Sequence, residues 1–262
     1  MPTPVLPTAE SPNHGNATNA RRRPCASEGL IRAARRGDAD FVKAWLSEKL
    51  PVEGDEDGFT PLMAAASLGR AECVRLLLPV CDAKARTGQQ GITALMLAAE
   101  VGSLECAQAL LPFSDVRAQD RAGGTALITA VICQLTKSSP DLVALLAKVS
   151  DMEQKDCDGC TALMVAGINN VSGALDILLP YANREQRQFA LDKFVELGAW
   201  ESADFVACRS ESDLRERALA QAPGKLPQTL AMEETRILMR EAQSAGLRAS
   251  LDTAPRRRPR SL

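Results

Sequence analysis

The chain has 262 residues and a formal net charge of −2, so it has no overall field that would attract nucleic acid or an anionic membrane. Apolar residues make up 45% and aromatic residues only 3%, so any core is built from small aliphatic side chains, which suit closely packed helices. No apolar run is long enough to span a bilayer and the amino terminus lacks the apolar block of a signal peptide, so we expect a soluble cytoplasmic protein.

Residues 1–26 are rich in Pro, Asn, Thr and Ala, and we expect a disordered amino-terminal tail because they cannot bury enough apolar surface to become ordered. His14, the only histidine, lies in this tail, which argues against a histidine-based triad or a histidine-ligated zinc enzyme. Basic runs at Arg21–Arg23 and Arg256–Arg258 are import signals, phosphate contacts or, as we favour for short runs, solvated tails. An import signal would add nuclear entry to the cytoplasmic prediction.

Two segments of the chain have similar sequences: GFTPLMAAASLGRAECVRLLL at residues 58–78 and GITALMLAAEVGSLECAQALL at residues 91–111. A Thr-x-Leu-Met/Ile element marks the repeat and recurs at intervals of 33, 32 and 36 residues, at Thr60, Thr93, Thr125 and Thr161. A glycine stands two residues before each threonine, at positions 58, 91, 123 and 159. Four glycines in phase predict a tight turn with positive φ in each repeat.

Each repeat predicts two short helices after its turn. The first begins after the threonine, carries apolar residues such as Leu62 and Leu95, and ends at Gly69 or Gly102 in the first two repeats. The second helix carries apolar residues three and four positions apart, which line one helical face. The order turn, helix, turn, helix predicts an all-α chain.

This pattern resembles the ankyrin repeat, whose core reads Thr-Pro-Leu-His-x-Ala within about 33 residues. The residues that carry the resemblance in the first full copy are Gly58, Thr60, Pro61, Leu62, Ala65, Ala66, Gly69, Val74, Leu76 and Leu77. The resemblance implies an all-α solenoid of helix-turn-helix units joined by short hairpin fingers, in which neighbouring units bury each other's apolar faces. It also implies a non-enzymatic surface that binds other proteins.

Two departures from the family pattern recur. Four repeats have an apolar residue where the family usually has His, namely Met63, Met96, Ile128 and Met164. Because this change removes side-chain hydrogen bonds that brace neighbouring loops, we expect somewhat looser loops. Three repeats have Ala in place of the family's Pro, and the resulting Thr-Ala-Leu-Met spelling resembles the ankyrin-only proteins of unicellular parasites.

The predicted array spans residues 27–209 and contains six units, of which the outer two are degenerate. Residues 30–46 lack the Gly-x-Thr turn, and their Arg and Asp content fits an amino-terminal cap with one polar face. Residues 189–208 fit a carboxy-terminal cap with a shortened hairpin. The insertion that lengthens the last interval lies at residues 134–139, where Ser139 is expected to cap a helix through its hydroxyl and Pro140 to occupy the first helical position.

Residues 210–262 form a carboxy-terminal extension outside the array. Residues 228–251 predict an amphipathic helix with Leu230, Ile237, Leu238 and Leu247 on its apolar side, followed by the basic tail. Three alternatives remain for this helix: it docks on the array, it docks on a partner, or it stays frayed.

The eight cysteines are expected to be reduced thiols, because the chain shows no export signal. Cys157 and Cys160 have the spacing used for zinc binding or thiol exchange, but the Asp158–Gly159 turn lies between them, so we favour a structural role. A zinc site would need two further ligands nearby. Cys73 and Cys106, 33 residues apart, are expected to behave as small buried apolar residues.

We expect partners to bind the concave face of the array, where the fingertips (residues 53–57, 86–90, 117–121 and 154–158) and the outward positions of the first helices lie. Leu68, Leu97, Val101 and Val165 stand four or eight residues after a threonine and are predicted to form an exposed apolar stripe. The alternative is that inter-repeat packing or the terminal helix covers them. Two fingertip cations, Arg86 and Arg121, are expected to steer and select partners.

The sequence therefore predicts a monomeric, non-enzymatic interaction module or scaffold for partner proteins. We expect no metal, cofactor, nucleic-acid partner or membrane insertion. The chain has no Gly-rich phosphate loop, His-Arg-Asp or Asp-Phe-Gly element, which excludes a protein kinase. A regulatory or targeting subunit of a kinase remains an alternative, as does a zinc or redox protein acting through Cys157 and Cys160.

Overall fold

The computed structural model describes residues 27–133, 139–232, 234–235 and 237–239. The chain divides into two compact units, Met1–Ala182 and Asn183–Leu262, and each is described by itself. The predicted tail at residues 1–26 and the basic runs near both termini lie outside the described residues. No helix of the described part is both long and apolar enough to cross a bilayer.

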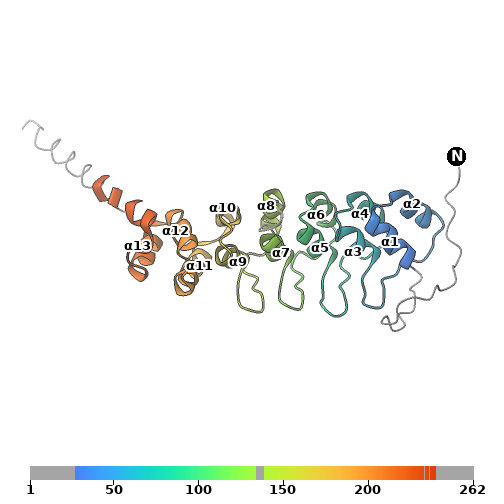
Figure 1. Ribbon diagram of the computed structural model, residues 1–262, viewed down its shortest axis with the longest axis horizontal. Coiled ribbons are helices and arrows are strands. Elements are labelled where there is room, and N and C mark those ends of the chain that lie inside the picture. The colour runs from blue at the N-terminus through green and yellow to red at the C-terminus, as the bar shows by residue number, and fades with distance from the viewer. Residues whose placement is uncertain (1–26, 134–138, 233, 236, 240–262) are drawn as a thin grey trace, which may run out of the picture. The chain divides into compact units, whose positions relative to one another are not determined.

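The described residues of the first unit form a row of helix pairs (Figure 1). The first members are the inner helices, α1 (Glu28–Arg36), α3 (Pro61–Ala66), α5 (Ala94–Val101), α7 (Ala126–Cys133) and α9 (Ala162–Ile168). The second members are the outer helices, α2 (Ala39–Ser47), α4 (Ala71–Leu77), α6 (Leu104–Leu110), α8 (Pro140–Val149) and α10 (Ser172–Leu178), the last followed by the 3₁₀ turn η1 (Leu179–Tyr181). Figure 1 shows a long loop, or finger, hanging from each inner helix after α1. The all-α prediction is confirmed.

The repeated threonines begin the inner helices. In all four repeats the threonine Oγ1 accepts a hydrogen bond from the backbone N–H three residues on, at 3.2 to 3.4 Å. In the first two repeats the methionine at that third position accepts the threonine N–H on its sulfur at 3.5 Å, which completes a capping box. Met63 and Met96, which replace the family's His, thus satisfy a backbone donor of their own repeat, and the expected loosening of the loops stays a prediction.

Packing between neighbouring pairs supplies the core. Each inner helix contacts the inner helix of the next pair, and from α2 to α10 each outer helix contacts the next outer helix. The leucine two residues after each repeat threonine is at most 1% exposed, at positions 62, 95, 127 and 163. A single pair could not cover these side chains, so burial makes the pairs depend on one another.

The fingers are numbered 1 to 4 and comprise residues 53–57, 86–90, 117–121 and 154–158. As predicted, the glycine that follows each has a positive φ, between 69° and 76°. Backbone hydrogen bonds join neighbouring fingers or the residues beside their tips: Gly88 N to Asp57 O at 2.7 Å, Arg121 N to Gln90 O at 2.8 Å, and Cys157 N to Ala122 O at 2.8 Å. Among the described residues only one isolated β-bridge occurs, between Lys155 and Thr161.

The start of α8 differs from the prediction in one respect. Pro140 is the first helical residue as expected, but the Ser139 side chain makes no capping bond. Its hydroxyl instead donates to the carbonyl of Gly102 at 3.0 Å, at the end of α5. A carbonyl at a helix end has no intrahelical partner, so it competes successfully for this hydroxyl.

The second unit contains α11 (Arg184–Leu197), α12 (Trp200–Cys208) and α13 (Ser212–Gln221). α11 begins five residues before the predicted cap at residue 189, because Asn183 and Gln186 form a capping box. Helix α13 was not predicted from the sequence. The role of α11 and α12 as the end of the array stays a prediction.

Helical backbone follows at the described residues of 227–239 and begins one residue before the predicted 228–251 segment. Asp204 of α12 holds its first turn, because its Oδ1 accepts the Thr229 N–H at 2.9 Å and also the Thr229 hydroxyl. Thr229 is fully buried, so this carboxylate replaces the water that would otherwise satisfy those donors. Leu230, Ile237 and Leu238 are exposed, and Leu247 lies outside the described residues.

Candidate protein-binding groove

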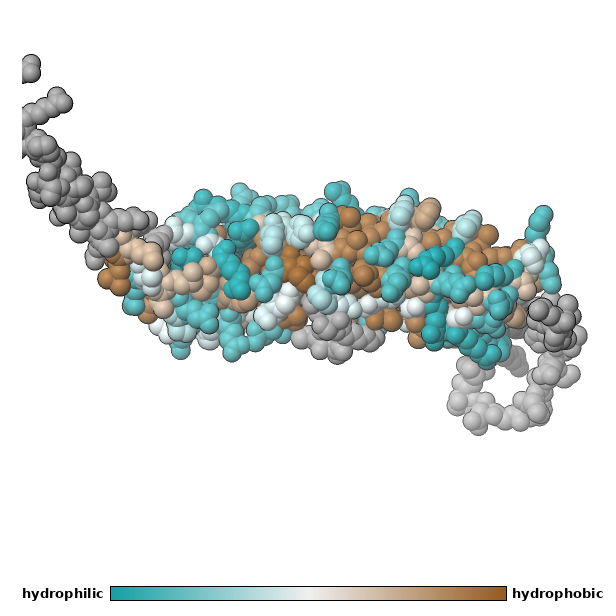
Figure 2. Space-filling model, turned by 90° about the horizontal axis from the view of Figure 1, so that it is seen from above, coloured by the Kyte–Doolittle hydropathy of each residue, from teal (hydrophilic) through white to brown (hydrophobic). Residues whose placement is uncertain are grey.

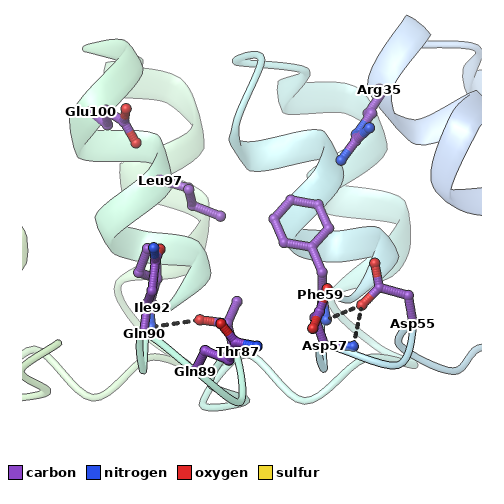
Figure 3. Close-up of a pocket in the computed structure, with 10 residues that line it drawn as sticks. All are labelled: Arg35, Asp55, Asp57, Phe59, Thr87, Gln89, Gln90, Ile92, Leu97 and Glu100. Carbon is purple, nitrogen blue, oxygen red and sulfur yellow. Dashed lines mark hydrogen bonds between the residues drawn. The ribbon is translucent and has the colours of Figure 1, made fainter. Parts of the chain in front are cut away.

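A groove of about 670 Å³ lies between fingers 1 and 2 on the side of the inner helices. Figure 3 shows its lining residues, which come from α1, α5 and the two fingers with the residues beside them. They are Arg35, Asp55, Asp57, Phe59, Thr87, Gln89, Gln90, Ile92, Leu97 and Glu100. The groove therefore depends on adjacent repeats being stacked in register.

The floor of the groove is apolar. Phe59 and Ile92 occupy the same position in successive repeats, immediately before the capping threonine, and both are partly exposed. Leu97 joins them from α5, and Figure 3 shows its side chain directed toward the Phe59 ring. A concave apolar floor with polar walls is the usual composition of a binding site.

The walls of the groove are held by hydrogen bonds within and between the fingers. Asp55 Oδ1 accepts the backbone N–H groups of Asp57 at 3.0 Å and Phe59 at 2.8 Å. Thr87 Oγ1 makes the matching bond in finger 2, accepting the N–H of Ile92 at 3.0 Å. Because these bonds fix the loops before any ligand arrives, binding would cost little loop ordering.

The upper end of the groove carries charge of both signs. The Arg35 guanidinium lies over the Phe59 ring at 5.2 Å from its centroid, a cation–π contact between α1 and the first repeat. Glu100 is exposed on α5. An incoming chain thus meets an apolar floor, amides and carboxylates along the fingers, and one cation above.

The sequence of the array matches a known protein family. A model of ankyrin repeats, in three copies, matches residues 13–86, 30–120, 80–148 and 95–188, which together cover more than half of the chain. The chain is an ankyrin-repeat protein. No curated protein matches it significantly. The family indicates a protein–protein interaction module, whereas the resemblance to parasite proteins stays a prediction.

The ankyrin array does not expose the predicted apolar stripe as a whole. Leu68 is 49% exposed and Val101 is partly exposed, but Leu97 is 8% and Val165 7% exposed, so the prediction of exposure is wrong for these two. Both stand four residues after the threonine, in the middle of their inner helices, where α5 packs against α3 and α7 and α9 packs against α7. The position eight residues after the threonine lies near the helix end, beyond this packing. Leu97 still contributes to the groove floor.

The predicted fingertip cations differ in their surroundings. Arg86 is exposed, and its Nε donates to the carbonyl of Gly91 in its own loop at 3.2 Å. Arg121 is also exposed, and its backbone N–H belongs to the bond that joins it to finger 2. Neither residue lines the groove, so their part in partner selection stays a prediction.

Sequence reasoning did not select Arg35, Phe59 or Ile92 as site residues. Phe59 and Ile92 could have been predicted as site residues from their position before the threonine, because a bulky apolar residue next to a turn is hard to bury completely. Arg35 had no such signal, since its contact with Phe59 joins α1 to a residue of the next repeat.

Cys157 lies on finger 4 and Cys160 immediately before the capping Thr161, as the repeat pattern predicted. Asp156 Oδ1 accepts the backbone N–H groups of Asp158 at 3.0 Å and Cys160 at 2.8 Å, which is the loop bracing that Asp55 provides in finger 1. Within the described part of the chain, no group of three or more His, Cys, Asp or Glu residues is placed to hold a metal ion. Among the described residues, no further ligands therefore join Cys157 and Cys160 in a zinc site.

Cysteine burial gives a testable order of thiol reactivity. Cys73 and Cys106 are buried as predicted, and burial raises the pKa of both thiols. Burial also raises the pKa of the Cys81 thiol to about 11, whereas Cys157 is exposed. Because the thiolate is the reactive form, alkylation of the native protein at mildly alkaline pH should modify Cys157 well before these three. Peptide mapping by mass spectrometry measures the order, and a denatured sample that reacts at all four sites is the control.

Proposed function

We propose that this ankyrin-repeat protein acts without catalysis, as a module that binds a segment of a partner protein in the groove between fingers 1 and 2. The single observation that carries the proposal is the pre-formed groove, whose apolar floor comes from residues of adjacent repeats. The partner segment covers Phe59 and Ile92 and forms hydrogen bonds with the finger amides and carboxylates. A scaffold role would follow if other surfaces bind different proteins at the same time.

Exposed groove residues give a cleaner test than the buried Leu97. Gln89 and Gln90 line the groove and are exposed, and the inter-finger bond uses the carbonyl of Gln90 rather than its side chain. Replacing both with arginine narrows the groove and adds two charges, so partner capture should fall at least tenfold while the fold persists. Affinity purification from the native cell with quantitative mass spectrometry measures the loss for each captured protein.

The matched control adds two arginines elsewhere on the surface. Gln221 on α13 and Gln228, both in the second unit, are exposed and line no part of the groove. The Gln221→Arg/Gln228→Arg protein should retain its partners, and circular dichroism should show the same helicity in all three proteins. Equal capture by the groove variant and the wild type would refute the groove as the binding site.

A further inference from the structure

The outer helices carry a row of exposed apolar side chains at one repeat position. Val80, Phe113, Val149 and Tyr181 are 50%, 56%, 51% and 41% exposed. In each case the next residue donates its backbone N–H to the carbonyl three positions before the exposed residue, for example Cys81 to Leu77 and Ser114 to Leu110. The same local geometry therefore orients all four side chains. We call these four residues the outer band.

The outer band is distinct from the groove. It lies at the ends of the outer helices α4, α6, α8 and α10, whereas inner helices and fingers form the groove. Figure 2 views the molecule from the side on which α4, α6 and α8 lie in Figure 1, and apolar surface gathers over this region. A single exposed apolar residue is ordinary, but a row repeated in consecutive units indicates a surface that another molecule covers.

The outer helices also set a charged edge beside the outer band. The residue four positions before each member of the outer band is apolar and partly exposed, as at Leu76 and Leu145. Eight residues before them stand exposed carboxylates in three successive outer helices, Glu72, Glu105 and Asp141, of which Glu72 is paired with Lys43 Nζ at 3.0 Å. Residues four apart share one helical face, so α4, α6 and α8 each present an acidic and then an apolar residue along one face, and the member of the outer band follows at or just past the helix end.

The spacing between members of the outer band indicates whether an α-helix or a β-strand would fit it better. Packed neighbouring helices lie about 8–10 Å apart, so the members of the outer band recur at about that distance along the array. A helix with one apolar residue in every seven presents them about 10.5 Å apart, which nearly matches this spacing. A β-strand presents side chains to one face about 6.6 Å apart and fits poorly.

We propose that the outer band binds an amphipathic α-helix of a partner protein that lies across α4, α6, α8 and α10. The helix places one apolar residue of each heptad against each member of the outer band. Its flank toward Glu105 and Asp141 carries Lys or Arg, because these carboxylates favour a basic flank over an acidic one, whereas Glu72 is already paired with Lys43. The outer band and the groove then form two separate binding surfaces on one array.

A library of displayed helices tests the outer band directly. Twenty-eight-residue helices, about four heptads by the seven-residue spacing argued above, carry leucine at every seventh position and randomised flanks, and are selected on the full chain. The selected helices should be enriched in Lys or Arg on one flank. They should bind at least tenfold more weakly to Phe113→Asp and Val149→Asp, because a buried carboxylate without a partner opposes docking. Glu105→Lys should weaken binding several-fold, by replacing attraction with repulsion.

Two controls separate this surface from the groove and from misfolding. Ile168, at the end of α9, is 42% exposed and lies outside the outer band, so Ile168→Asp should bind the selected helices like the wild type. The Gln89→Arg/Gln90→Arg groove variant should also bind them normally. Selected helices that tolerate both Phe113→Asp and Val149→Asp, or that lose binding only in the groove variant, would overturn the proposal.

Sedimentation of the unliganded protein tests whether a second copy of this chain, rather than a partner helix, covers the outer band. A concentration-dependent dimer that Phe113→Asp abolishes, together with a selection that yields no helix, would assign the outer band to a second copy of this chain and overturn the partner-helix proposal. A monomer that binds the selected helices supports it.

Discussion

Replacing Gly123 with alanine is expected to lower the free energy of unfolding by about 2–5 kcal/mol, by two effects that add. Gly123 has φ near +75°, where an alanine costs about 1–2 kcal/mol because of its Cβ. A Cβ at this position would also lie 2.8 Å from the Cα of Asp156 and the backbone N of Cys157, so finger 4 would have to move. That movement costs about 1–3 kcal/mol more, as other forced contacts in packed regions do.

The loss should be concentrated at the junction of fingers 3 and 4. That junction is held by the Cys157 N–H to Ala122 bond and by two amide side chains, since Gln119 donates to Lys155 O at 2.8 Å and Gln154 to Arg117 O at 3.0 Å. Urea unfolding followed by circular dichroism measures the stability, and hydrogen exchange locates the loosened fingers.

Gly159 supplies a matched control for Gly123→Ala. It has the same backbone conformation, with φ of +76°, but a Cβ there would meet nothing within 4 Å. Gly159→Ala should therefore cost only the conformational part, about 1–2 kcal/mol. Equal losses in the two variants would show that the close approach of finger 4 does not limit residue 123.

Replacing Leu95 with alanine should cost about 2–5 kcal/mol, as for other buried leucines. Leu95 is 0% exposed on α5, which contacts α3, α6 and α7, so the cavity would open at the centre of the array. In a repeat protein the loss falls on nearest-neighbour interfaces, so we expect the single unfolding transition to broaden or to split into two. Urea denaturation followed by circular dichroism detects the change in both midpoint and shape.

Leu68→Ala is the control for Leu95→Ala. Leu68 is a leucine of the neighbouring repeat that is 49% exposed, so its truncation should change stability by less than about 0.5 kcal/mol. A large loss in Leu68→Ala, or none in Leu95→Ala, would contradict the assignment of the core to the inner-helix leucines.

The candidate sites were harder to predict than the helices. The repeat pattern in the sequence predicted the inner helix around Leu97 correctly, but it did not show that the Leu97 side chain is buried by neighbouring helices. It placed Cys160 in the same repeat position as Phe59 without identifying that position as the floor of a groove. It also gave no hint of the outer band, because a residue such as Phe113 looks like core in a sequence and only its accessible surface shows otherwise.

The features that each repeat specifies locally could be predicted from the amino-acid sequence. The positive-φ turns at Gly58 and Gly123 and the threonine caps depend on residues close together in the chain, whose geometry allows few alternatives. The tertiary structure alone decided which side chains remain exposed, the groove between two fingers and the row of apolar residues on the outer helices. These properties depend on how each repeat is covered by its neighbours, and burial between repeats is a long-range property that no single repeat encodes.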